Sequence, residues 1–183
     1  MLSPSTIQKA QVILLSVSMT LFGQCSTGEN KEPIEYKGPV SEMENVELFY
    51  TENEKVKVKM LADLLYEFES GDREFPKGVY IEFFGPDGAT ISSTLKADHA
   101  YYFKKEDHWR GRRNVEVKNL AKNEQLNTEE LFWRPRDRKI FTDKFVTIRQ
   151  QNDVLYGQGL TANEDLSDYV IQKPYGDMDV KEE

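Results

Sequence analysis

The chain has 183 residues, which is enough for one ordinary domain with short appendages. Hydrophobic residues make up 38% of it and charged residues 31%, a composition that excludes an intrinsically disordered chain. The net charge of −8 argues against nucleic acid as a partner, because the phosphate backbone repels an acidic surface. The aromatic share of 11% favours β-sheet over helix bundles.

The first 25 residues are typical of an export signal. Lys9 precedes an apolar run over residues 12–22, and Gly23-Gln24-Cys25 follows it. A transmembrane helix needs roughly twenty apolar residues, so this run is short for a permanent span. We therefore predict a signal peptide or short membrane anchor over residues 1–25.

Cys25 is the only cysteine, so an internal disulfide is excluded. It stands directly after the apolar run, where bacterial lipoproteins carry the cysteine that is acylated. The match to a lipobox is partial, because Gln24 occupies the position that normally holds a small residue. We interpret Cys25 as a lipidation site; the alternative is an uncleaved anchor with an incidental thiol. Residues 26–44 have scattered charge and no apolar period, which predicts a flexible tether.

Strand signals recur in the remainder with a period of about 31 to 36 residues. Alternating apolar runs occupy residues 46–50, 79–83, 115–117 and 146–148. Residues typical of tight turns follow them at 52–54, 85–88, 122–124 and 151–153. The pattern predicts about four strand-turn-strand units in an all-β domain over residues 45–176, with an acidic tail over 177–183.

The alternation places one set of side chains on a shared apolar face. The set consists of Leu48, Tyr50, Val79, Ile81, Phe83, Val115, Val117, Val146 and Ile148. Glu47, Glu82 and Glu116 lie on the opposite face. Because a strand pair with one apolar face is unstable alone, we predict a twisted antiparallel β-sandwich of the jelly-roll kind. Residues 63–69 admit a helical turn as an alternative to strand.

Five short motifs occur in order along the chain. They are Tyr36-x-Gly38-Pro39, Gly71-Asp72-x-Glu74-Phe75-Pro76-x-Gly78, Ala97-Asp98-x-Ala100, Leu126-x-Thr128-Glu129-x-Leu131-x-Trp133 and Gly157-x-Gly159. With the short N-terminal anchor, this order resembles the LptC family, the periplasmic component of the lipopolysaccharide exporter. The resemblance covers nearly the whole chain. It departs at the N-terminus, where many relatives keep a transmembrane helix.

The resemblance implies a function and three partners. Lipopolysaccharide would leave the inner membrane through an LptBFG-type ABC transporter and pass along an apolar groove to an LptA-type bridge protein. The nine residues of the apolar face would contact its acyl chains. The joint to LptA would be a backbone-paired strand edge near Gly157, Gly159, Tyr169, Val170 and Ile171. The protein would lie in the periplasm, tethered to the inner membrane.

No catalytic site, metal site or cofactor is expected. His99 and His108 are the only histidines, and neither has metal-ligand spacing or lies beside a nucleophile motif. Asp63 and Asp98 occupy equivalent positions in two units, so we interpret them as turn caps rather than an acid/base pair.

Two arginine clusters fall at positions that resemble turns: Arg110, Arg112 and Arg113, and Arg134, Arg136 and Arg138. Guanidinium groups suit lipid A phosphates, and the alternative is solvated loop charge. Two other functions stay open. An exported β-sandwich that binds protein or carbohydrate predicts a solidly packed interior. A soluble lipocalin-like carrier predicts a closed barrel without free strand edges.

Overall fold

The computed structural model describes residues 36–151 and 153–175. These residues form eleven β-strands and one short 3-10 helix, and no α-helix occurs among them. The predicted all-β class is therefore confirmed, and the stretch after Asp63 continues a strand rather than forming a helical turn. Cys25 and the rest of the predicted signal segment lie outside the described residues, as does the tail over 177–183.

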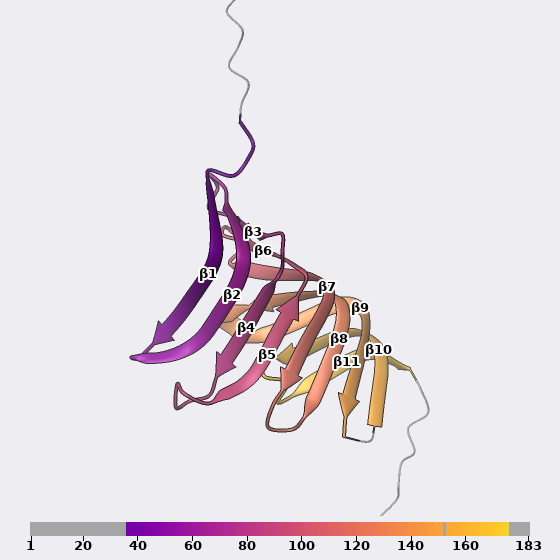
Figure 1. Ribbon diagram of the computed structural model, residues 1–183. Helices are drawn as coiled ribbons and strands as arrows, with labels where there is room; N and C mark the ends of the chain where they lie inside the picture. Colours follow the sequence, from indigo (N-terminus) through magenta and orange to yellow (C-terminus); the bar gives the residue numbers. More distant parts are fainter. Residues whose placement is uncertain (1–35, 152, 176–183) are drawn as a thin grey trace, which may run out of the picture. The chain divides into compact units, whose positions relative to one another are not determined.

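The strands follow one another with short connections, and the first begins within the segment that the sequence assigns to the tether (Figure 1). The elements are β1 (Ser41–Glu52), β2 (Lys55–Glu67), β3 (Arg73–Phe75), β4 (Val79–Phe84), β5 (Ile91–Ala97), β6 (His99–Phe103), β7 (His108–Asn119), β8 (Glu124–Arg134), η1 (Pro135–Asp137), β9 (Lys139–Gln150), β10 (Asp153–Asn163) and β11 (Tyr169–Tyr175).

The four predicted units are four antiparallel hairpins. They pair β1 with β2, β4 with β5, β7 with β8, and β9 with β10. The connecting turns use residues with positive φ, among them Asn53, Gly88 and Asn123. Asn and Gly tolerate this conformation best, so the turn chemistry read from the sequence is the reason each hairpin forms where it does.

All strand pairs are antiparallel and belong to one sheet, which closes on itself in part. β2 pairs with β4 near its start and with β3 near its end. β7 likewise pairs with β6 through its first half and with β5 through its second. The strands β2, β4, β5, β7, β6 and β3 therefore form a ring of two layers. β8 to β11 extend the sheet beyond β7, and β1 flanks β2.

The strands that extend the sheet bend near their middles. Register shifts interrupt the pairing of β7 with β8, of β8 with β9, and of β9 with β10. Arg113, Asn114 and Gly159 adopt positive φ at these shifts, as expected for β-bulges. A side chain on Gly157 would meet the backbone oxygen of Lys173 at 2.8 Å. Gly159 thus lies at a bulge and Gly157 at a close approach of two backbones, while their part in a joint to a partner stays a prediction.

The predicted alternation decides what is buried. Seven of the nine residues assigned to the apolar face lie in the packed core: Val79, Ile81, Phe83, Val115, Val117, Val146 and Ile148. The exceptions are both on β1, where Leu48 is half-buried and Tyr50 is 59% exposed. β1 is the outermost strand and pairs only with β2, so fewer neighbours cover its apolar side.

Replacing Ile148 with Ala should lower the free energy of unfolding by about 2–5 kcal/mol, because a fully buried side chain leaves a cavity. Urea denaturation measures this change. Val154→Ala serves as the control, since Val154 is exposed and its loss should cost within about 0.5 kcal/mol. Equal effects of the two substitutions would contradict the assignment of the core.

Candidate functional site

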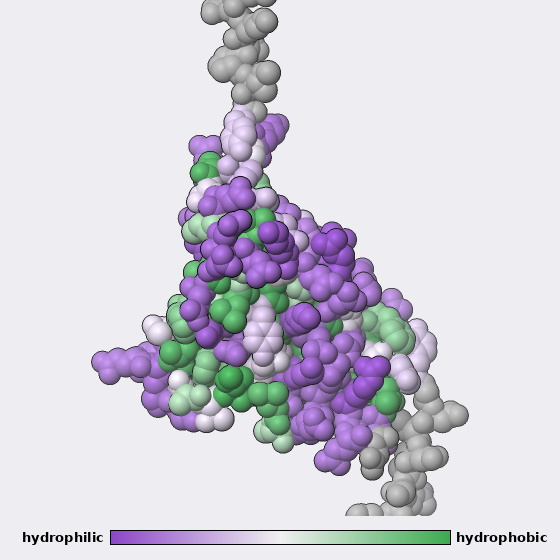
Figure 2. Space-filling model, viewed as in Figure 1, coloured by the Kyte–Doolittle hydropathy of each residue, from purple (hydrophilic) through white to green (hydrophobic). Residues whose placement is uncertain are grey.

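A cavity of about 690 Å³ opens between the β1–β2 hairpin and the strands that face it. Its apolar wall is made by Leu48, Val58, Met60, Trp109 and Trp133. Its charged residues are Lys57, Arg73, Arg136, Arg138, Glu52, Asp107 and Glu164. On the face shown in Figure 2, hydrophobic side chains gather over β2, β4 and β5, whereas hydrophilic ones cover most of β7 and β8.

A row of aromatic rings separates the cavity from the packed core. The rings of Trp109 and Trp133 lie 6.0 Å apart and line the cavity. Behind them, Phe75 lies 5.4 Å from Trp109, and Phe83 meets Trp133 edge to face at 5.2 Å. Phe75, Phe83 and Trp133 are all buried, whereas Trp109 is partly buried, so this row of rings is the side of the packed core that adjoins the cavity.

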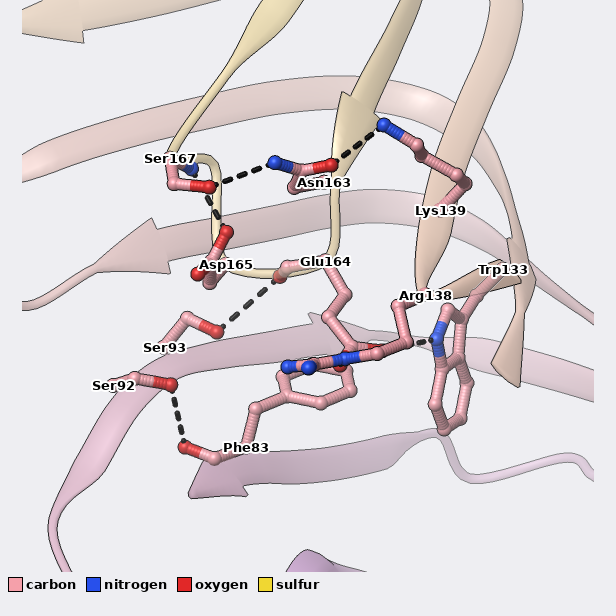
Figure 3. A network of polar contacts seen from close by, with 10 residues as sticks. All are labelled: Phe83, Ser92, Ser93, Trp133, Arg138, Lys139, Asn163, Glu164, Asp165 and Ser167. Atoms are coloured by element: carbon pink, nitrogen blue, oxygen red, sulfur yellow. Dashed lines mark hydrogen bonds and ion pairs between the residues drawn. The ribbon is translucent and has the colours of Figure 1, made fainter. Parts of the chain in front are cut away.

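Glu164, at the end of β10, holds one of these indoles in place (Figure 3). Its carboxylate accepts a hydrogen bond from Trp133 Nε1 at 2.9 Å and one from Arg138 Nε at 2.8 Å. Its main-chain oxygen accepts from Ser93 Oγ at 3.2 Å. Glu164 is only 7% exposed, and the hydrogen bond to it raises the pKa of Arg138. The carboxylate is thus a buried acceptor with a charged partner at the edge of the cavity.

The turn from β10 to β11 closes the interior beyond this network. Leu166 in the turn is fully buried, and the turn's main-chain oxygens accept hydrogen bonds from two distant side chains. Asn119 Nδ2 donates to Asp165 at 2.7 Å, and Lys122 Nζ donates to Ser167 at 2.9 Å. These bonds tie the turn to β7 and to the turn that follows it.

A second polar group lies on the opposite wall. The Tyr102 hydroxyl donates to Asp107 Oδ1 at 3.0 Å, and Arg136 Nε donates to Asp107 Oδ2 at 2.8 Å. Burial and the bond to Asp107 raise the pKa of Tyr102, so its hydroxyl stays protonated at neutral pH. The ring of Tyr102 packs 4.9 Å from that of Trp109. Arg73 lies on the same wall, with Nη2 3.3 Å from Glu67 Oε1.

Two of the nine residues predicted to contact lipid, Leu48 and Tyr50, line the cavity. Protein side chains surround the other seven, and the void beside Val79 and Ile81 measures only about 10 Å³. Contact of those seven with lipid stays a prediction. Val58, Met60 and Trp109 also line the cavity and were not among the predicted lipid contacts. A signal existed for the first two, since Val58 and Met60 alternate with lysines along β2.

The residues predicted to form a partner edge lie on the last two strands. Gly157 and Gly159 belong to β10, and Tyr169, Val170 and Ile171 belong to β11. Within the described residues, β11 pairs only with β10, which leaves its other side as an edge of the sheet. Val170 is 65% exposed there. Whether a partner pairs with this edge stays a prediction.

Several predictions about polar residues need correction. Arg110 and Arg112 lie within β7 rather than in a turn, and both approach Glu130, at 2.7 Å and 3.5 Å from Nε. Asp63 is not a turn cap, because it lies exposed within β2. Asp98 does lie at a turn, between β5 and β6, where it accepts a hydrogen bond from Asn114 at 2.6 Å.

The two histidines take part in contacts on strands β6 and β7. His99 Nε2 lies 2.9 Å from Glu74 Oε1, and His108 packs its ring 5.0 Å from that of Phe103. Across residues 36–151 and 153–175, no cluster of three or more His, Cys, Asp or Glu side chains is arranged to hold a metal ion.

The chain also matches a known protein family. The family described as "Lipopolysaccharide-assembly, LptC-related" matches residues 10–173. The chain belongs to the LptC-related family. Membership implies a part in lipopolysaccharide transport and a periplasmic protein associated with the inner membrane, in a family of transport components rather than enzymes. No curated protein sequence matches the chain significantly. The described part of this LptC-family chain contains no helix with the length and hydropathy of a membrane span.

Replacing Glu164 with Ala should cost about 1–3 kcal/mol of stability, because the buried Trp133 N–H loses its acceptor. The loosened indole should also shift tryptophan emission to the red. Urea unfolding and fluorescence measure the two effects. Glu129→Ala, which removes an exposed glutamate from β8, should leave both unchanged. Wild-type stability and emission in Glu164→Ala would show that the network does not hold the cavity wall.

Proposed function

We propose that this protein receives the acyl chains of lipopolysaccharide in the cavity beside β1 and passes the molecule from an LptBFG-type transporter to an LptA-type bridge protein. The observation that carries the proposal is a cavity of about 690 Å³ with one apolar wall, in a chain of the LptC-related family. Residues of β1, an outer strand of the sheet, line this cavity, so a cargo beside β1 need not displace the packed core.

The cavity size bounds how the cargo is held. Cavities of roughly 300–1,000 Å³ enclose a small ligand, so this one takes part of a lipopolysaccharide molecule and not the whole. Each Å² of acyl surface removed from water contributes about 25 cal/mol. Such contacts have no preferred direction along the chain. They therefore favour a cargo that moves through the protein over one that stays in it.

The two outer strands support a place within a chain of similar proteins. β1 pairs only with β2, and β11 pairs only with β10, among the described strands. Free edges accept strands from partners through main-chain hydrogen bonds. We assign the β11 edge to LptA and the β1 side to the transporter. Attachment to the inner membrane would run through an acyl group on Cys25 or through an uncleaved anchor, which the mass of membrane-extracted protein distinguishes.

Two other functions fit the structure less well. A β-sandwich that binds protein or carbohydrate on its surface would have a solidly packed interior, whereas two indoles here face open space. A lipocalin-like carrier would close its barrel and leave no free edges. Here the described sheet leaves both β1 and β11 at its edges.

A photo-crosslinking residue at Leu48 should capture lipopolysaccharide in cells with a working transporter, because Leu48 lines the cavity. The same probe at Glu47 should capture none, since that side chain lies on the opposite face and pairs with Lys59 at 2.6 Å. Immunoblotting for lipopolysaccharide adducts measures both. Equal labelling at the two positions, or labelling that persists when ATP hydrolysis is blocked, would contradict transport through the cavity.

Replacing Val170 with Pro should weaken binding to LptA by tenfold or more, because proline cannot donate to a strand pair and its ring disturbs the edge. Val170→Thr keeps the N–H and the branched side chain, so it should bind as wild type does. Calorimetric titration with purified LptA gives the affinities, and circular dichroism checks that both variants are folded. Wild-type affinity in a folded Val170→Pro protein would place the joint elsewhere.

A further inference from the structure

Most of the arginines predicted to bind phosphate pair with carboxylates of the protein, either outside the cavity or at its edge. Arg110 and Arg112 share Glu130. Arg134 lies 3.2 Å from Asp137 and stacks over the ring of Phe141. Arg138 faces the cavity, but Glu164, Asp165 and Glu52 all surround it and raise its pKa. None of these groups offers a positive field to a ligand in the cavity.

Arg73 and Arg136 also have carboxylate partners, Glu67 and Asp107, but each has one such ion pair and lies at the cavity. Both line the cavity, and both lie close enough to the Tyr102 hydroxyl to favour its ionised form, against the stronger effects of burial and Asp107. Arg73 Nε is buried and has no hydrogen-bond partner among the described residues. Nε itself is closed to a ligand, but the Arg73 side chain is 36% exposed, so its terminal N–H groups can donate to an anion in the cavity.

Arg136 also has donors to spare. Its side chain is 83% exposed, and its Nε forms an ion pair with Asp107 at 2.8 Å. A guanidinium carries five N–H donors, so one such bond leaves capacity for a second anion. The Tyr102 hydroxyl lies beside the same carboxylate and can turn its proton to another acceptor.

We propose that Arg73, Arg136 and Tyr102 form an anion site at the cavity, which binds a phosphate monoester on an amphiphile whose acyl chains occupy the apolar wall. The inference rests on the proposed function and adds the group that recognises the head of the cargo. A phosphate monoester offers three acceptor oxygens and more than one negative charge, which matches two guanidinium groups and a hydroxyl that line one cavity from β3, η1 and β6.

The carboxylates in the site set its strength. Glu67 and Asp107 hold the arginines in place when no ligand is bound. Their negative charge also opposes a bound phosphate, so the site binds reversibly rather than trapping its ligand. Reversible binding is what a cargo in transit requires.

The test compares the affinities of full-length protein for lipid A that carries its phosphates and for the same lipid A after dephosphorylation. Arg73→Gln and Arg136→Gln should each weaken binding of the phosphorylated form about tenfold, as expected for loss of one charge-assisted hydrogen bond. Neither should change binding of the dephosphorylated form by more than about twofold. Arg134→Gln removes the same charge outside the cavity and should bind both forms as wild type does.

Other results would each overturn part of this proposal. Wild-type affinity in both cavity variants, or an equal loss for the two forms of lipid A, overturns the phosphate site and leaves the proposed function standing. Failure of the wild-type protein to bind either form overturns both. Glucosamine 6-phosphate, which lacks acyl chains, should bind at least a hundredfold more weakly than lipid A. Equal affinity would instead indicate a site for soluble phosphate esters and overturn the assignment to an amphiphile.

Discussion

Bulges in β7, β8, β9 and β10 allow a single sheet to cover its own apolar face. An antiparallel sheet with one apolar face must cover that face, and no α-helix in the described part of the chain is there to do so. The bulges near Arg113, Asn114 and Gly159 bend and twist the strands in which they lie. One sheet can then enclose a core and still keep two outer strands.

The same geometry explains why the interior is only partly filled. Where the layers lie close, Val117, Leu126 and Ile148 fill the space. Near β1 fewer strands cover the core, because β1 pairs only with β2. The cavity lies there, with Trp109 and Trp133 in its lining. Two bulky rings make a firm wall, and the buried acceptor Glu164 fixes one of them. An apolar cavity with a defined wall is thereby compatible with a stable domain.

Local chemistry made much of this fold predictable. Period-two alternation and Asn or Gly turns act within a hairpin, so the four hairpins and their buried faces follow from the sequence. The short strand β3, the ring closure through β6 and the cavity depend on which distant side chains oppose one another, which alternation does not encode. Arg73 drew no attention because Asp72 and Glu74 flank it in an acidic stretch. Its importance depends on its position beside Tyr102, a contact that only the folded chain creates.

Acyl chains in the cavity would lie against Trp109 and Trp133. These are the 2 tryptophans of the chain, and both line the cavity, so their fluorescence responds to a quencher bound there. Titration with lipid A whose acyl chains carry bromine, a quencher that acts at close contact, tests the claim directly. We expect strong, saturable quenching, and none from the same lipid brominated only on its sugar head group. Binding of the brominated acyl chains without quenching would show that lipid lies elsewhere on the protein.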